Sequence, residues 1–203
     1  MGDAGDVPIP GQAPPPPPSS AQYLQYGVAF TGDFTGFLSS PGNMCDGAVR
    51  ADGRQETTCI LSSGGGIVFP RVGWRPGGPW YFGGAYAASK QDPNKLYRLA
   101  ILQQLRAEAR YYFRPELQTQ PFLNAGLGVA GYGNEWKVDT WGPLAVLGFG
   151  LEAQISRRTV VSLGLNYRAV LFSKFTDTSG AIRPAGIATL IGIELALEGR
   201  DPI

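Results

Sequence analysis

Ionisable side chains of both signs are spaced two residues apart in several segments of this chain. Arg106, Glu108 and Arg110 are the clearest example. Alternate residues of a β-strand point to the same face, so these three would share one surface. The complete set of such residues is Asp33, Arg71, Arg106, Glu108, Arg110, Glu152, Arg168 and Glu194. They could line a gate or conduction path, or form a buried ion-pair network that fixes the strand register. We favour the network.

The chain contains no histidine. This excludes Ser-His-Asp and Cys-His catalysis and the usual proton shuttle. No spacing of carboxylates, tyrosines or lysines singles out a catalytic site. We therefore expect neither enzymatic activity nor a cofactor, and a membrane-bound acyltransferase or deacylase is a remote alternative.

Two cysteines, Cys45 and Cys59, flank a polar segment. In an oxidising compartment we expect a disulfide that closes this segment into a stapled loop, with two free thiols as the alternative. Two cysteines without histidine are too few ligands for a metal site.

Composition limits the class of protein. Hydrophobic residues make up 43% of the 203 residues and charged residues 16%, whereas a soluble domain carries about a quarter charged residues. The net charge of +1 gives no reason to expect a nucleic-acid partner. No segment approaches the roughly 18 apolar residues of a membrane helix, so a membrane span would have to be built from strands.

The chain divides into three parts. Residues 1–21 are proline-rich and predict a disordered tail, either a passive lead-in or a docking segment for an envelope partner. Residues 22–198 are expected to form a barrel, and residues 199–203 a short C-terminal tail. The first residues lack the basic and apolar regions of a secretory signal, so we expect the sequence to be a mature form.

Alternation of apolar and polar residues predicts strands at about 24–35, 65–75, 79–89, 97–114, 121–133, 145–154, 161–171 and 186–197. A helix is the rival for 97–114, but helical spacing would mix the arginines with the leucines and tyrosines. Pro70 interrupts the second strand and is expected to mark a bulge.

The connections between these strands alternate in length. Short turns fall at 76–78, 115–118 and 156–158, and longer polar loops at about 40–64, 89–96, 133–141 and 173–183. Short periplasmic turns and longer external loops are typical of outer-membrane barrels. The sequence therefore predicts an all-β fold, an eight-stranded antiparallel up-and-down transmembrane β-barrel.

The polarity of the two faces separates a membrane barrel from a soluble, lipocalin-like lipid binder. The apolar face carries aromatic residues suited to membrane interfaces, namely Tyr26, Trp74, Trp80, Tyr111, Phe113, Trp141 and Tyr167. The polar face is rich in glycine and alanine, which would leave room for long charged side chains in a narrow interior. We therefore expect the apolar face to meet lipid and the charged face to fill the lumen.

Several segments carry a family resemblance. PFLNAGLGVAGYG (121–133), LGFGLEAQISRRTVVSLGLNYRAVLF (147–172), GIATLIGIELAL (186–197) and RVGWRPGGPWYFGGAYAASK (71–90) are similar to the OmpA-like family of small eight-stranded outer-membrane barrels. The resemblance implies a bacterial outer-membrane location with membrane lipids as partners. The chain departs from this family because its last strand does not end in an aromatic residue and no peptidoglycan-binding domain follows.

The leading hypothesis for function is a structural or interaction scaffold with a side-chain-filled lumen. The alternatives are a narrow channel or transporter for small solutes and, further off, the lipocalin-like binder. A protein partner in the envelope would be reached through the loops or the proline-rich tail.

Overall fold

The computed structural model describes residues 21–35, 48–56, 61–91 and 97–203. Eight long strands dominate the fold: β1 (Tyr23–Phe34), β4 (Gly64–Arg75), β5 (Trp80–Gln91), β6 (Ala100–Tyr112), β7 (Thr119–Asn134), β8 (Thr140–Gln154), β9 (Thr159–Phe172) and β12 (Gly186–Pro202). Four short strands lie between them: β2 (Ala48–Val49), β3 (Gln55–Glu56), β10 (Phe175–Thr176) and β11 (Ile182–Arg183).

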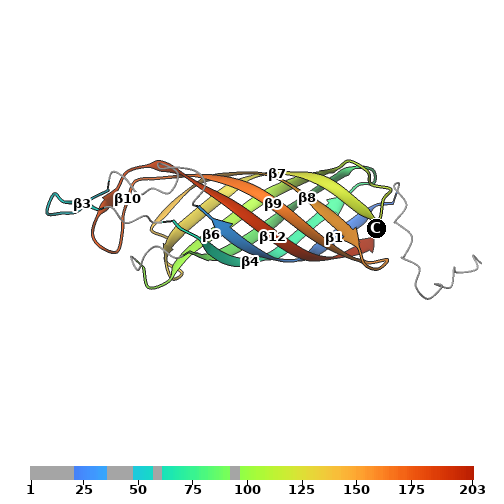
Figure 1. The fold of residues 1–203 in the computed structure, drawn as a ribbon, viewed down its shortest axis with the longest axis horizontal. Helices are drawn as coiled ribbons and strands as arrows, with labels where there is room; N and C mark the ends of the chain where they lie inside the picture. The colour runs from blue at the N-terminus through green and yellow to red at the C-terminus, as the bar shows by residue number, and fades with distance from the viewer. Residues whose placement is uncertain (1–20, 36–47, 57–60, 92–96) are drawn as a thin grey trace, which may run out of the picture.

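The long strands close into one antiparallel barrel in the order β1-β12-β9-β8-β7-β6-β5-β4 (Figure 1). Long strands that are consecutive in the chain are neighbours in the barrel, and β1 closes it against β12. The predicted eight-stranded up-and-down barrel is confirmed. Within the described residues, no helix is long and apolar enough to cross a membrane.

The two ends of the barrel differ. Short turns join β4 to β5, β6 to β7 and β8 to β9 at one end, where Tyr23 of β1 also pairs with Pro202 of β12. The longer connections gather at the other end, from which the short strands β3 and β10 project (Figure 1). By the usual orientation of such barrels, the short-turn end faces the periplasm and the long-loop end faces outward.

A bulge at Pro70 brings Arg71 into the barrel. The β4–β5 register shifts between Val68 and Arg71, as the sequence predicted. Odd-numbered Ile67 and Phe69 face outward before the bulge, whereas even-numbered Val72 and Trp74 face outward after it. The extra residue therefore reverses the alternation, and both Val68 and Arg71 are buried in the interior.

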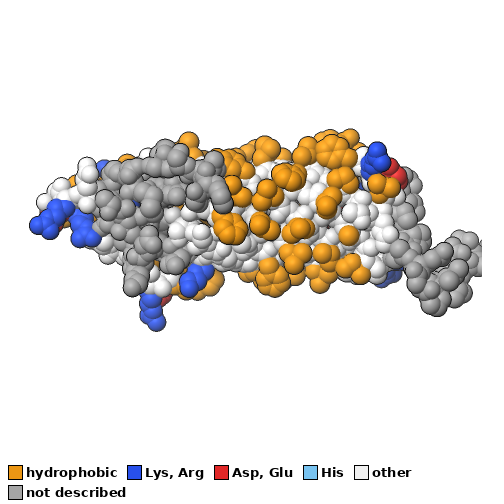
Figure 2. Space-filling view, in the orientation of Figure 1, with side chains coloured by type: hydrophobic (Ala, Val, Ile, Leu, Met, Phe, Trp, Pro, Cys, Tyr) orange, Lys and Arg blue, Asp and Glu red, His pale blue; other side chains and the backbone are white. Residues whose placement is uncertain are grey.

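The outer wall is apolar and the inner wall is largely polar. Phe30, Leu105, Leu127 and Leu147 are each at least 60% exposed, while the arginines and glutamates of the same strands are buried. Figure 2 shows hydrophobic side chains across the middle of the barrel, with Lys and Arg only towards its ends. A soluble barrel has the opposite polarity, so the lipocalin-like alternative is excluded.

Two features of the fold differ from the prediction. The last strand was expected to end at about residue 197, but β12 continues to Pro202 because its ladder with β1 runs on to the Tyr23–Pro202 pair. Most of the predicted tail at 199–203 is therefore part of the barrel wall. In addition, the short strands form a small sheet in the order β10-β11-β2-β3 at the long-loop end, which the sequence did not predict.

Candidate functional site

The lumen near the periplasmic end is crossed by an ion-pair network. Arg110 of β6 donates to both carboxylate oxygens of Glu198 of β12, at 3.0 Å each. Its guanidinium also lies 5.0 Å from the ring centroid of Tyr81 and 5.3 Å from that of Phe122. The planar group is thus paired along its edge and packed against aromatic rings.

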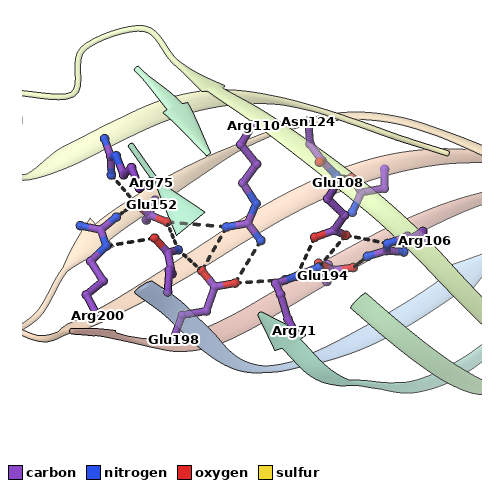
Figure 3. Close-up of polar contacts among 12 residues, drawn as sticks. Arg71, Arg75, Arg106, Glu108, Arg110, Asn124, Glu152, Glu194, Glu198 and Arg200 are labelled. Atoms are coloured by element: carbon purple, nitrogen blue, oxygen red, sulfur yellow. Dashed lines mark hydrogen bonds and ion pairs between the residues drawn. The ribbon is translucent and has the colours of Figure 1, made fainter. Parts of the chain in front are cut away.

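Arg71 connects this pair to a second group of charges (Figure 3). It donates to Glu108 at 3.0 Å and to Glu198 at 3.4 Å, and it also pairs with Glu194. Arg106 donates to the same Glu108 at 2.6 Å and to Glu194 at 3.1 Å. Each of these carboxylates therefore accepts from two arginines or more, as buried charges require.

Glu152 of β8 is the acceptor at the periplasmic mouth. It pairs with Arg200 and accepts from the Tyr112 hydroxyl at 2.9 Å and the Gln25 amide at 3.2 Å. Arg75 lies 3.7 Å from Glu152 and stacks over the Tyr112 ring, with its guanidinium carbon 4.1 Å from the centroid. These contacts tie β1, β4, β6 and β12 to β8 across the lumen.

A separate ion pair lies nearer the long-loop end. Asp33 of β1 pairs with Arg168 of β9 and accepts from Gln91 at 3.0 Å and from Thr31 at 2.9 Å. Among the described residues, no hydrogen bond or ion pair joins this pair to the Arg110 network. The lumen therefore contains two ionic groups at different depths.

Beside Arg168 and from there towards the long-loop end, the interior becomes apolar along β6 to β9 and β12. Inward-facing side chains of β6, β7, β8, β9 and β12 pack with residues of the loops in one buried cluster, whose larger members are Leu61, Tyr97, Leu102, Tyr132, Leu144, Val146, Val170, Phe172, Phe175 and Leu190. The ring centroids of Tyr132 and Phe172 are 6.1 Å apart, and those of Tyr97 and Tyr132 are 5.5 Å apart. We call this set the apolar layer.

The hairpin of β10 and β11 is held beside the apolar layer by a buried carboxylate. Asp177 accepts from the Ser179 hydroxyl at 2.6 Å, from Arg183 at 2.8 Å, and from the backbone N–H groups of Ser179 and Ala181 at 2.9 and 3.0 Å. Burial raises the pKa of Asp177, but these hydrogen bonds outweigh it and hold the pKa below the usual aspartate value of 3.8. The turn is thus organised around an ionised side chain.

Small residues make room for the large interior groups. A Cβ atom built on Gly73 or on Gly83 would lie 2.4 Å from atoms of the Tyr81 side chain, so the tyrosine ring fills space that only glycine leaves open. The sequence prediction that inward glycines serve interior packing is consistent with this contact.

The eight charged residues predicted for the lumen are all buried in it. The structure joins six of them in the Arg110 network (Arg71, Arg106, Glu108, Arg110, Glu152 and Glu194), whereas Asp33 and Arg168 form the separate pair. Sequence reasoning missed Arg75, Glu198 and Arg200. The latter two continue the period-two series of Glu194, which was the available signal.

The predicted interface aromatics lie on the outer wall. Tyr26, Trp74, Trp80, Tyr111 and Phe113 all belong to the periplasmic ends of their strands, and Trp80 packs edge-on against Tyr111 with centroids 5.0 Å apart. Trp141 lies at the opposite end, and Tyr167 lies in the long-loop half of β9. In contrast, Tyr97, assigned by alternation to the outer face, is buried inside. Cys45 and Cys59 lie outside the described residues.

The lumen offers no vacant ligand set. Its buried charges comprise six arginines and five carboxylates, namely Arg71, Arg75, Arg106, Arg110, Arg168, Arg200, Asp33, Glu108, Glu152, Glu194 and Glu198. Each carboxylate already accepts from one arginine or more. No group of three metal-ligating side chains occurs in the part of the chain that the structure describes. The arrangement is suited to holding strands together across the lumen.

Comparison with known proteins supports the fold. No family model and no curated protein matches the chain. Among solved structures, Neisserial surface protein A is similar with a TM-score of 0.53 and 16% identity, covering 90% of this chain and 97% of that one. The outer membrane protein OprG from Pseudomonas aeruginosa has a TM-score of 0.52 and 13% identity, covering 91% and 98%.

At these identities, the likeness shows the fold. The fold is that of small eight-stranded outer-membrane barrels, which confirms the predicted resemblance to the OmpA-like group at the level of architecture. A closed barrel with an apolar exterior and an ionic interior is suited to lipid outside and protein contacts inside. The chain is a bacterial outer-membrane β-barrel, as predicted.

Proposed function

We propose that this protein is a non-conducting membrane scaffold that anchors and presents its extracellular sheet and loops. The observation that carries the proposal is the filling of the lumen by two chemically different layers in series. Charged groups cross it near the periplasmic end, and the apolar layer, built from β6 to β9, β12 and the loops, occupies it near the outer end.

The ionic layer opposes passage because its contacts run from wall to wall. Displacing Arg110 from Glu198 would break the bidentate pair between two buried charges, which costs several kcal/mol. A solute would have to break Arg71 from three carboxylates as well. The network therefore favours a fixed interior.

The apolar layer opposes ions for a different reason. An ion entering between Tyr132, Phe172 and Leu190 would exchange most of its water for apolar side-chain surface. A charged solute that passes the ionic layer is thus rejected by the apolar layer. An apolar solute that passes the apolar layer is rejected by the ionic layer.

The extracellular sheet offers a surface for recognition. Val49 of β2 and Ile182 of β11 pair across this sheet and remain 43% and 46% exposed. An apolar pair on an exposed sheet suits contact with a protein partner. The proposal assigns no catalysis to the barrel, because the chain lacks histidine and its lumen carboxylates are engaged by arginines.

Planar-bilayer recording tests the closed lumen. Purified protein, shown to be inserted and folded by heat-modifiable gel migration, should give no stepwise conductance. Reproducible single-channel steps from the wild-type protein would overturn the proposal.

A narrow water-filled conduit is the second candidate. It is favoured by buried polar atoms that lack a hydrogen-bond partner between the two layers, namely Gln91 Oε1, Gln104 Nε2 and Arg168 Nε. Bound water could satisfy them. Such a conduit would have to continue through the apolar layer, so a proton or water flux that Leu190→Trp abolishes would favour it.

A further inference from the structure

We propose that exposed cations on one side of the extracellular rim bind the phosphate groups of a phosphorylated glycolipid in the outer leaflet. The inference rests on the placement of the barrel in the outer membrane. It does not depend on whether the lumen conducts.

The cations lie along consecutive strands. Lys90 lies near the outer end of β5, Arg98 precedes β6, Lys137 lies between β7 and β8, and Lys174 follows β9. These strands are neighbours in the order β5, β6, β7, β8, β9. The four side chains thus follow one arc of the rim, which we call the basic arc.

Backbone contacts hold the segments of the basic arc together. The N–H of Glu135 donates to the carbonyl of Leu99 at 2.6 Å, beside Arg98. The N–H of Ser173 donates to the carbonyl of Trp141 at 3.3 Å, beside Lys174. These bonds fix the backbone beside Arg98 and beside Lys174 to the neighbouring strands.

The basic arc is not neutralised by its own acids. Arg98 lies 3.6 Å from Glu135 and Lys137 lies 3.3 Å from Asp139, but the two basic side chains are 88% and 82% exposed. The Arg98–Glu135 pair is exposed on both sides and contributes little, and although the Asp139 side chain is only 7% exposed, its Lys137 partner stays accessible. Lys90 and Lys174 make no ion pair with any described residue.

Exposed aromatic and apolar side chains accompany the cations. Trp136 is 70% exposed and Val138 47%, in the same loop as Lys137, and Trp141 is 63% exposed at the start of β8. Tryptophan favours the level of lipid headgroups. Leu105, Leu127, Leu147 and Leu171 line the wall of β6 to β9 below them.

This order of groups identifies the ligand class. An acyl chain would lie along the leucines, the headgroup would contact the tryptophans, and the phosphates would meet the basic arc. Basic residues beside a membrane attract anionic headgroups by about 1 kcal/mol each, which is about fivefold in affinity. A phosphorylated glycolipid of the outer leaflet combines all three features.

The test compares two triple variants of the full chain in detergent micelles. One is Lys90→Gln/Lys137→Gln/Lys174→Gln in the basic arc. The control is Arg114→Gln/Arg157→Gln/Arg158→Gln in the periplasmic turns, which removes the same charge from the other end. Native mass spectrometry follows the titration of purified lipid A, and gel migration confirms that both variants fold.

Lipid A should bind the wild type and the periplasmic control alike, and the basic-arc variant about a hundredfold more weakly. Enzymatically dephosphorylated lipid A should bind the wild type as weakly as it binds the basic-arc variant. Equal binding of lipid A by all three proteins, or equal losses in both variants, would overturn the proposal.

Inorganic phosphate separates a lipid site from a free-anion site. If millimolar phosphate displaces lipid A completely, the arc is an anion site and the proposal is wrong. Retention of lipid A in phosphate buffer supports it. Conductance recorded from the same samples reports on the closed lumen separately, so either proposal can fail without the other.

Discussion

Arg110 and Glu198 face each other across the full width of the barrel, joined by two hydrogen bonds of 3.0 Å. Three strands separate β6 from β12 in one direction around the barrel, and three in the other. A single bidentate pair therefore bridges opposite walls of the lumen. Because both side chains are buried, each depends on the other for compensation of its charge.

Replacing Glu198 by Gln should destabilise the barrel strongly. The change leaves Arg110 without its bidentate acceptor and removes one of the three carboxylates that contact Arg71. We expect a loss of about 3–5 kcal/mol in the free energy of unfolding, measured by urea titration in lipid vesicles.

Glu116→Gln is the matched control, because Glu116 is exposed in the β6–β7 turn and should change stability by less than about 0.5 kcal/mol. The double variant Arg110→Gln/Glu198→Gln should lose less than the sum of the two single losses. Strict additivity would show that the pair is not coupled.

The two layers of the lumen should act in series. Tyr132→Ala/Phe172→Ala removes the ring contact in the apolar layer, and Arg71→Ala/Arg110→Ala removes the arginines that bridge the ionic layer. Each pair of changes leaves the other layer in place, so we expect silent bilayers from both. Only the fourfold variant should conduct, provided that heat-modifiable migration shows it folded.

Conductance from the apolar-layer variant alone would mean that the ionic layer does not seal the lumen. Conductance from the ionic-layer variant alone would mean the same of the apolar layer. Either result would mean that one layer alone closes the lumen, and not two layers in series.

The sequence predicted the barrel because period-two alternation is strong in most strands. Arg106, Glu108 and Arg110 were placed correctly inside, opposite Leu105 outside. Arg71 lies inside only because the bulge at Pro70 reverses the alternation of β4. A bulge was predicted there, but its effect on the faces of the strand required the observed register.

The apolar layer was not predicted because it hides the alternation. Where Leu102 faces inward beside Ile101, both faces of β6 are apolar and the period-two signal disappears. A segment that is apolar on both faces at the outer end of a strand was the sequence signal that could have predicted the apolar layer. The sheet of β2, β3, β10 and β11 had no such sign, because two-residue strands carry no periodicity and the β2–β11 pairing joins segments far apart in the sequence.

The β10–β11 hairpin should loosen at low pH. The hydrogen bonds to Asp177 lower its pKa in the folded hairpin below 3.8, so the ionised form stabilises the hairpin. That stabilisation is complete above pH 3.8 and is lost as the pH falls through the lower, folded value. We expect the amides of Ser179 and Ala181, which donate to Asp177, to lose protection from hydrogen exchange in that range.

Asp177→Asn provides the control for this prediction. An amide cannot ionise, so the variant should show weak protection at neutral pH and little further change on acidification. An equally steep pH response in Asp177→Asn would assign the effect to another group.

The expected disulfide between Cys45 and Cys59 agrees with the register of the hairpin between them. Ala48 of β2 pairs with Glu56 of β3, and Val49 pairs with Gln55. Cys45 precedes Ala48 by three residues in the sequence, and Cys59 follows Glu56 by three. The two cysteines are therefore equally distant along the chain from the same cross-strand pair, and the disulfide between them stays a prediction.

Protein purified without reductant should therefore not react with a maleimide, and should gain two labels after reduction. Cys45→Ser should expose one reactive thiol without reduction, because Cys59 then has no partner. Closing the loop restricts the unfolded chain, so reduction should lower stability by about 3 kcal/mol. Two labels on the unreduced wild-type protein would establish free thiols instead, and would remove the staple from the extracellular surface that the barrel presents.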